Sequence, residues 1–322
     1  MAQLTFPKLH CPFPSQINQH VDVMGDYSLE WVLRFNLLAK ESTYRRFSQS
    51  KFFLLAARAY PSCELEELKI GNDWLSWVFI WDDQCDLSEL KKQPEALKVY
   101  HKRFLEILNG AEPTSNDIPL THALYDLRQR TVQRASKEWF RHFLLYFEEY
   151  FQGCVEEAAV RAQNIVPDVD TYMMIRRASV GGNLFLTVSE FCNNFMLSNF
   201  LRNHYFVDKL KLMTINVLAW CNDVFSASRE MASGDVHNIV LVLHYQQQLS
   251  LETSIERAVI MHDKEMESLV SLEASMPVFG NELDTELAQY ISIMHAWIRG
   301  NLDWYSYTDR YQSVEMLEPV KY

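Results

Sequence analysis

The chain has 322 residues, of which 48% are hydrophobic and 13% aromatic, so it can bury a large core. Its formal net charge of −12 argues against a nucleic-acid-binding protein, and a polyanionic substrate would need metal ions or an arginine cluster to bind. With only 9 glycines and 10 prolines, the composition also disfavours a turn-rich all-β fold.

The first residues and the cysteines predict where the protein resides. Residues 1–23 contain neither the basic segment nor the apolar segment of a signal peptide. No apolar run approaches the ~18 residues needed to span a membrane, and the six cysteines include no CxxC pair. We therefore expect a cytoplasmic protein with reduced thiols and no stable membrane anchor, either a monomer or a homodimer.

The pattern along the chain predicts an arm followed by one helical domain. Residues 1–24 hold three prolines and few periodic apolar positions, so we expect an extended arm laid over the rest of the protein. Residues 25–322 are predicted to form a single all-α domain, because apolar positions recur at helical spacing and no repeat or long linker interrupts them. Prolines mark the boundaries between the periodic segments. The predicted helices span 28–40, 44–60, 64–85, 95–109, 120–132, 135–163, 168–200, 205–232, 235–248, 251–275 and 281–307.

An acidic cluster follows an apolar run at the end of the helix predicted for 64–85. In Asp82-Asp83-Gln84-Cys85-Asp86, a helix places three carboxylates on one side, and burying carboxylates that repel each other is costly. Such a cluster either faces water or holds cations. Hard oxygen ligands on one face suit Mg²⁺, which takes one or two protein carboxylates together with waters and phosphate oxygens. The motif alone leaves a solvated helix end and a metal site equally open.

A second polar stripe closes the apolar helix predicted for 205–232. Asn222, Ser226 and Glu230 are four residues apart, so an amide oxygen, a hydroxyl and a carboxylate follow one face of the helix. Three hard oxygen donors can provide one face of an octahedral Mg²⁺ site, and the neighbouring Arg229 can hold a phosphate oxygen. The alternative is the polar face of an ordinary helix.

These two motifs together resemble those of the class I terpene synthases, in their bacterial or fungal single-domain form. Residues 172–182 resemble the family's effector-helix segment, and residues 297–311 end in Arg310-Tyr311, like its C-terminal Arg-Tyr motif. The four motifs match the family in order and spacing from about residue 74 to residue 311. The resemblance implies an all-α bundle around a central active-site cavity.

The resemblance also implies the metal ligands. Asp82 would ligate two of three Mg²⁺ ions, for which Mn²⁺ can substitute, and Asp83 and Asp86 would support them. The third ion would be held by the second motif through Asn222, Ser226 and Glu230. Cys85 is expected to point away from the metals.

The same resemblance implies the diphosphate-binding residues. Arg177 would sense the diphosphate, with Val180 and Gly181 as linker and effector. The helix break expected at the paired glycines would aim a backbone carbonyl into the cavity, and close helix packing is the alternative. Arg229, Arg310 and Tyr311 would bind diphosphate oxygens when the site closes.

Ionisation of an allylic diphosphate yields a carbocation, which aromatic faces can stabilise without reacting. We expect Phe79, Phe185 and Trp304 to line the cavity, with Phe53 and Tyr305 as further candidates. For each of these aromatics, an ordinary place in the core is the alternative.

We therefore predict a Mg²⁺-dependent terpene cyclase, a carbon–oxygen lyase acting on phosphates, with a prenyl diphosphate as its partner. The family form favours farnesyl diphosphate and a sesquiterpene product, and one route is 1,10-closure to a germacrene- or selinene-type product. The alternatives are a cyclase acting on geranyl or geranylgeranyl diphosphate, a trans-prenyltransferase and a non-enzymatic helical binding protein. The absence of a second DDxxD motif counts against the prenyltransferase.

Overall fold

The computed structural model describes residues 7–311, which form helices and no strand, so the all-α prediction is confirmed. None of the helices in this part of the chain has the length and apolar character that crossing a membrane requires. The elements are α1 (Val21–Arg34), α2 (Glu41–Ser50), α3 (Phe52–Ala59), α4 (Leu65–Asp86), the 3-10 turn η1 (Glu89–Lys92), α5 (Pro94–Leu108), α6 (Pro119–Val132), α7 (Lys137–Gln163), α8 (Val169–Ser179), α9 (Gly182–Cys192), α10 (Asn199–Arg202), α11 (Tyr205–Ala232), α12 (Ile239–Gln247), α13 (Leu251–Ala274) and α14 (Asn281–Tyr305).

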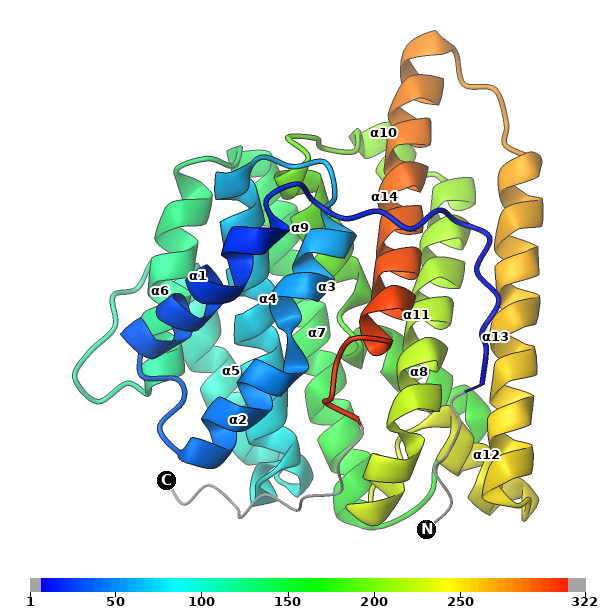
Figure 1. Ribbon diagram of the computed structural model, residues 1–322, viewed down its shortest axis with the longest axis horizontal. Coiled ribbons are helices and arrows are strands. Elements are labelled where there is room, and N and C mark those ends of the chain that lie inside the picture. The colour runs from blue at the N-terminus through cyan, green and yellow to red at the C-terminus, as the bar shows by residue number, and fades with distance from the viewer. Residues whose placement is uncertain (1–6, 312–322) are drawn as a thin grey trace.

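The long helices surround a common centre (Figure 1). Helix α4 packs against α3, α6 and α9 on one side of the bundle, and α11 packs against α13, α14 and α8 on the other. Both helices are rich in buried side chains, which agrees with their long apolar segments. The two predicted metal motifs, at the C-terminal ends of α4 and α11, are therefore placed on opposite sides of the centre.

The part of the predicted arm that the structure describes is residues 7–20, which run over the bundle, because α1 already begins at Val21. The arm passes along α13 and across α14 (Figure 1). The backbone N–H of His10 donates to Asp263 on α13 (2.9 Å), and the ring of Phe13 stacks on His295 of α14 with centroids 3.7 Å apart. These contacts hold the arm on the outer face of the bundle.

Two predicted helices are broken by residues with positive φ. The helix predicted for 44–60 divides at Lys51, which has φ +50° and separates α2 from α3. The segment predicted as one helix over 168–200 breaks at Gly181, with φ +69°, and α9 then ends at Cys192. Glycine adopts this conformation without strain, so the paired glycines do mark the expected break. A Cβ on Gly182 would lie 2.7 Å from Ile215 Cγ1, which shows that this glycine also permits close packing against α11.

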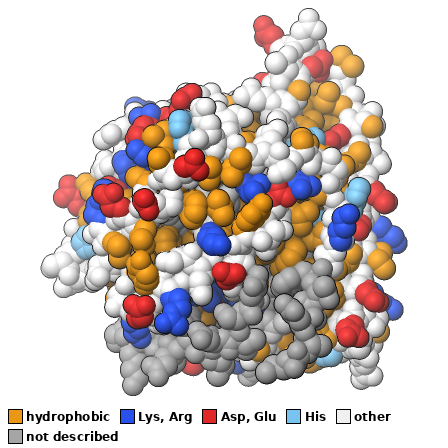
Figure 2. Space-filling model, in the orientation of Figure 1, with side chains coloured by type: hydrophobic (Ala, Val, Ile, Leu, Met, Phe, Trp, Pro, Cys, Tyr) orange, Lys and Arg blue, Asp and Glu red, His pale blue; other side chains and the backbone are white. Residues whose placement is uncertain are grey.

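Charged side chains of both signs are interspersed over the face of the molecule shown in Figure 2. Between them lie hydrophobic side chains in small groups. The described Lys and Arg side chains on this face form no continuous basic area, in keeping with the net charge of −12.

Acid is expected to weaken the fold through His101 on α5. This side chain is 4% exposed, stacks on Phe151 (centroids 4.1 Å apart) and accepts a hydrogen bond from Trp81 Nε1 (3.1 Å). Burial lowers the pKa of His101 to about 3, whereas an unfolded histidine protonates near pH 6.5. The unfolded state therefore binds more protons between these values, and the free energy of unfolding falls as the pH drops below about 6.5.

The free energy of unfolding should be about 2 kcal/mol lower at pH 5 than at pH 7. Urea unfolding at pH 7 and at pH 5 measures it, with His101→Gln as the comparison, because the Gln amide can also accept from Trp81 but does not titrate. The variant should lose about 2 kcal/mol less than the parent between the two pH values. Equal losses in the two proteins would show that His101 is not the responsible group.

Candidate active site

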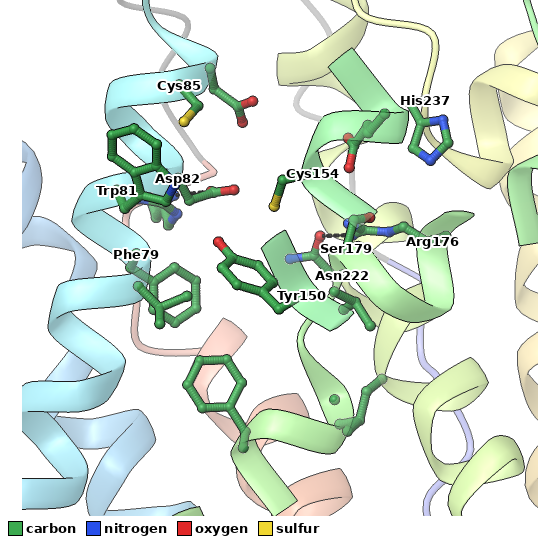
Figure 3. A pocket seen from close by; sticks show the side chains of 18 of the residues that line it. Phe79, Trp81, Asp82, Cys85, Tyr150, Cys154, Arg176, Ser179, Asn222 and His237 are labelled. Atoms are coloured by element: carbon green, nitrogen blue, oxygen red, sulfur yellow. Dashed lines mark hydrogen bonds and ion pairs between the residues drawn. The ribbon is translucent and has the colours of Figure 1, made fainter. Parts of the chain in front are cut away.

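A cavity lies between α4, α7, α8, α9, α11 and α14, at the centre of the bundle (Figure 3). One part is apolar and aromatic, and the other is lined by carboxylates and guanidinium groups. Asp82 extends into it from α4, while Asn222 and Arg176 lie on the opposite side. The lining residues include Phe79, Trp81, Asp82, Cys85, Asp86, Lys91, Tyr150, Cys154, Glu157, Arg161, Arg176, Ser179, Val180, Gly182, Phe185, Asn222, Arg229, Glu230, His237, Trp297, Asn301, Trp304, Tyr305, Arg310 and Tyr311.

The acidic cluster on α4 is divided between the cavity and its back wall. Asp82 lines the cavity, whereas Asp83 does not. Asp83 is held by two arginines: Arg310 donates to both of its oxygens (2.7 and 2.8 Å), and so does Arg46 (2.6 and 2.9 Å). Burial opposes ionisation, but these guanidinium groups keep the pKa of Asp83 well below its ordinary value. Asp83 is thus held by arginines behind the cavity wall and does not face the cavity.

Asp86 lines the cavity one turn further along α4 and faces an arginine of α7. Its carboxylate lies 3.3 Å from Arg161 Nη1. Arg161 also binds Glu157 and Asp235, each at 2.7 Å. Asp86 is thereby tied to a network of charges that crosses from α4 to α7 and to the loop before α12.

The stripe on α11 faces the cavity with its first and last members. Asn222 Oδ1 accepts from Arg176 (2.7 Å), and its amide donates to the hydroxyls of Tyr305 (2.8 Å) and Tyr311 (3.1 Å). Glu230 also lines the cavity. Ser226 is fully buried and does not reach the lining in this structure.

Asn238, at the start of α12, connects the members of this stripe. Its side-chain amide donates to Ser226 Oγ (3.2 Å) and to Glu230 Oε2 (2.9 Å). Its carbonyl oxygen accepts from Val240 N (2.8 Å) and so caps α12. The N-terminus of α12 therefore fixes the orientation of the two oxygen groups.

The arginine of α8 that reaches the cavity is Arg176, which corrects the prediction for Arg177. Arg176 bonds Asn222 and forms an ion pair with Asp223 (2.8 Å), and it lines the cavity (Figure 3). Arg177 donates instead to Asn216 (2.9 Å) and is absent from the lining. Adjacent residues on a helix point about 100° apart, so an error of one position turns a side chain out of the site.

The same shift of one residue applies to the predicted linker and effector. Ser179 and Val180 line the cavity, whereas Gly181 does not. The Gly181 carbonyl accepts from Phe185 N (3.0 Å) as the first bond of α9, so it is not the carbonyl expected to face the cavity. Ser179 Oγ is buried with no hydrogen-bond partner among the described residues.

Arg310 and Tyr311, predicted to bind diphosphate oxygens, line one side of the cavity. Besides binding Asp83, Arg310 lies over the ring of Phe79, 5.3 Å from its centroid, and 3.5 Å from Asp82. Arg229 lies 5.1 Å from the centroid of Tyr311. Cationic groups and aromatic faces therefore alternate along this wall.

The aromatic predictions are placed as follows. Phe79, Phe185, Trp304 and Tyr305 line the cavity, whereas Phe53 lies outside it, against Gly25 of α1. Phe79 stacks on Phe52 (centroids 4.4 Å apart) and Phe185 lies beside Trp297 (5.3 Å). Trp304 Nε1 donates to Ser50 O (2.8 Å), which fixes its ring.

Several polar lining residues escaped the sequence analysis. Tyr150 and Cys154 of α7 are two of them, and they line the cavity together with Cys85, which was expected to point away from the metals. The Glu157 and Arg161 pair on α7 is visible in the sequence as an i, i+4 ion pair, but nothing in the spacing shows that it faces α4. Such contacts depend on how the helices pack.

The charges of the cavity suit divalent cations, but the described residues do not form a complete set of metal ligands. Among residues 7–311, no three carboxylate, histidine or cysteine side chains converge on one point. Burial, together with Asp86, raises the pKa of Asp82 to about 7, and burial with Asp235 raises that of Glu230 to about 7. Asp82 and Glu230, on opposite sides of the cavity, thus have too few cationic partners to favour their ionised forms. Cations bound jointly by the protein and by phosphate oxygens would supply this positive charge.

Comparison with known proteins shows to which family this chain belongs. The model of terpene synthase family 2, C-terminal metal binding, matches residues 73–268. The chain belongs to terpene synthase family 2. Germacrene A synthase of Nostoc punctiforme is 61% identical over 322 residues, covering all of both chains. The (+)-T-muurolol synthase of Roseiflexus castenholzii, named as cyclizing (2E,6E)-farnesyl diphosphate, is 36% identical over 317 residues, 97% of each chain.

A solved structure shows the same fold in a more distant protein. The SVS_A2 protein from ancestral sequence reconstruction superposes with a TM-score of 0.84 at 24% identity, covering 94% of this chain and 90% of that one. The all-helical class I terpene synthase fold is thereby confirmed. So is the prediction of a sesquiterpene synthase, a carbon–oxygen lyase that binds a prenyl diphosphate and divalent metal.

Proposed function

We propose that this terpene synthase converts farnesyl diphosphate to germacrene A by 1,10-closure. The observation that carries the proposal is the 61% identity to germacrene A synthase over the full length of both chains. The cavity supports it, because an aromatic chamber ends in a cluster of arginines and carboxylates. The charged end suits the anionic leaving group, and the aromatic chamber suits the apolar chain of the substrate.

The two ends of the cavity would take part in different steps of the reaction. The C–O bond of the substrate breaks heterolytically, diphosphate takes the electron pair, and the distal double bond attacks the cationic carbon to close the ring. Loss of a proton from a methyl group beside the new cation then gives the hydrocarbon. Arg176, Arg229, Arg310 and Tyr311 hold diphosphate oxygens, where charge increases in the transition state.

Asp82, Asn222, Ser226 and Glu230 would hold three Mg²⁺ ions, which Mn²⁺ can replace, with Asp83 and Asp86 in support. Bound metal supplies Lewis-acid stabilisation of the leaving group. Ser226 would have to turn into the cavity from its present hydrogen bond with Asn238. We further propose a cytoplasmic protein, either a monomer or a homodimer.

The test is gas chromatography after incubation with geranyl, farnesyl or geranylgeranyl diphosphate and Mg²⁺. We expect germacrene A from farnesyl diphosphate, with one diphosphate released for each molecule of germacrene A formed. A different hydrocarbon would refute the product, and no hydrocarbon from any of the three would refute cyclase activity.

Phe79 is expected to control the product rather than the ionisation. Its ring lines the cavity and stacks on Phe52, and a leucine fills much of the same volume, so Phe79→Leu removes an aromatic face from the cation's surroundings without leaving a large void. Diphosphate release should stay within about 10-fold of the parent, while the product mixture changes. Phe53→Leu, outside the cavity, is the control and should leave the mixture unchanged. If Phe79→Leu leaves the product mixture unchanged, the ring of Phe79 does not contact the cation.

A further inference from the structure

Two adjacent lysines form a basic site that the mechanism above does not use. Lys91 and Lys92 end the turn η1, which follows the acidic cluster of α4. They line a small pocket beside the catalytic cavity. Lys91 and Arg161 also line the catalytic cavity itself, so the two spaces adjoin at its polar end. The rest of the small pocket is formed by Asn164, Gly234, Asp235 and Val236.

The two lysines bond neutral groups and no carboxylate of the described residues. Lys91 Nζ donates to the Ser233 carbonyl (3.3 Å), and Lys92 Nζ donates to Asn164 Oδ1 (2.7 Å), so both acceptors are neutral. Neither lysine forms an ion pair within residues 7–311. An ammonium group carries three donors, so each lysine keeps donors for a further ligand.

The one carboxylate that lines the small pocket has partners other than the lysines. Asp235 is bound by Arg161 (2.7 Å) and accepts from the backbone N–H groups of Val236 (2.7 Å) and His237 (3.0 Å). Arg161 is in turn shared with Glu157 and Asp86. One guanidinium therefore serves three carboxylates, and the two lysines are the cations lining this pocket that no carboxylate of the described residues binds.

We propose that Lys91 and Lys92 form a second anion site, which binds the diphosphate group as it enters and leaves the cavity. This inference rests on the proposed function. The net charge of −12 repels an allylic diphosphate, and two ammonium groups that bond only neutral acceptors offer it direct contacts beside the cavity. Because these lysines lie beside the proposed metal ligands and not among them, they act on binding and release rather than on ionisation.

The test compares two double variants that remove the same net charge. Lys91→Gln/Lys92→Gln removes the site, and Lys98→Gln/Lys102→Gln removes two lysines from α5, which line neither pocket. With farnesyl diphosphate at about 20 mM salt, the first variant should lose about 10-fold in kcat/KM, and the deficit should shrink at about 300 mM salt. Its single-turnover rate of ionisation should equal that of the parent.

A second measurement does not depend on turnover. Calorimetric titration with inorganic diphosphate, without metal, should show about 10-fold weaker binding to Lys91→Gln/Lys92→Gln than to the control. Equal kcat/KM at every salt concentration, or equal diphosphate binding, would overturn the proposal. If the parent makes no hydrocarbon, the proposed function fails, while the titration still decides whether the lysines bind diphosphate.

Discussion

Glu230→Gln is expected to reduce kcat/KM by about 10³-fold or more while the fold is retained. The substitution is isosteric, and the new amide oxygen can still accept the hydrogen bond from Asn238 (2.9 Å in the parent). What is lost is a negative charge facing the cavity, where cations would bind. The stabilisation of the leaving group should therefore fall, although the packing is unchanged.

Three measurements check this expectation. Diphosphate release reports turnover, calorimetry reports Mg²⁺ binding in the presence of inorganic diphosphate, and circular dichroism reports helicity. Glu267→Gln on the surface of α13 removes the same charge far from the cavity and should behave like the parent. Near-normal turnover of Glu230→Gln would exclude this carboxylate as a metal ligand.

The second large effect distinguishes two neighbouring arginines. Arg176→Lys should lower kcat by about 10²-fold or more, because Arg176 lines the cavity and a lysine could not make the two-pronged contact with diphosphate that we propose for it. Arg177→Lys should stay within about threefold of the parent, since Arg177 bonds Asn216 outside the cavity. Steady-state kinetics with farnesyl diphosphate measures both.

Lysine is chosen because Arg176 also pairs with the buried Asp223. Removing its charge would leave that carboxylate unpaired, at a cost of about 3–5 kcal/mol in stability. Thermal unfolding should confirm that both lysine variants are folded. If Arg177→Lys is the impaired variant, the register deduced from the structure is wrong and the one predicted from the sequence is right.

The sequence was sufficient for the parts of the site that follow from helical periodicity. Asp82 and Asn222 fall on the cavity side of their helices because long apolar segments determine which face of α4 and α11 is buried. The assignment of Arg177 failed because the position of the break at Gly181 decides which of two adjacent arginines faces inward.

Other features have no local signal. Arg46 and Arg161 bind carboxylates of α4 from α2 and α7, and such partners are determined by the packing of distant segments. Lys51 adopts a left-handed conformation, which is uncommon outside glycine, so the division of α2 from α3 could not be expected. Helical periodicity therefore predicts which face is buried but does not identify its tertiary partners.

The pairing of acids and arginines around the cavity has a consequence for handling the enzyme. Asp83 is bound by Arg46 and Arg310, and Asp86 lies beside Arg161, so both carboxylates have partners within the protein without bound metal. This differs from small zinc domains, which unfold when a chelator removes the ion. Purification in a chelating buffer should yield an intact, inactive protein that regains activity when Mg²⁺ is restored.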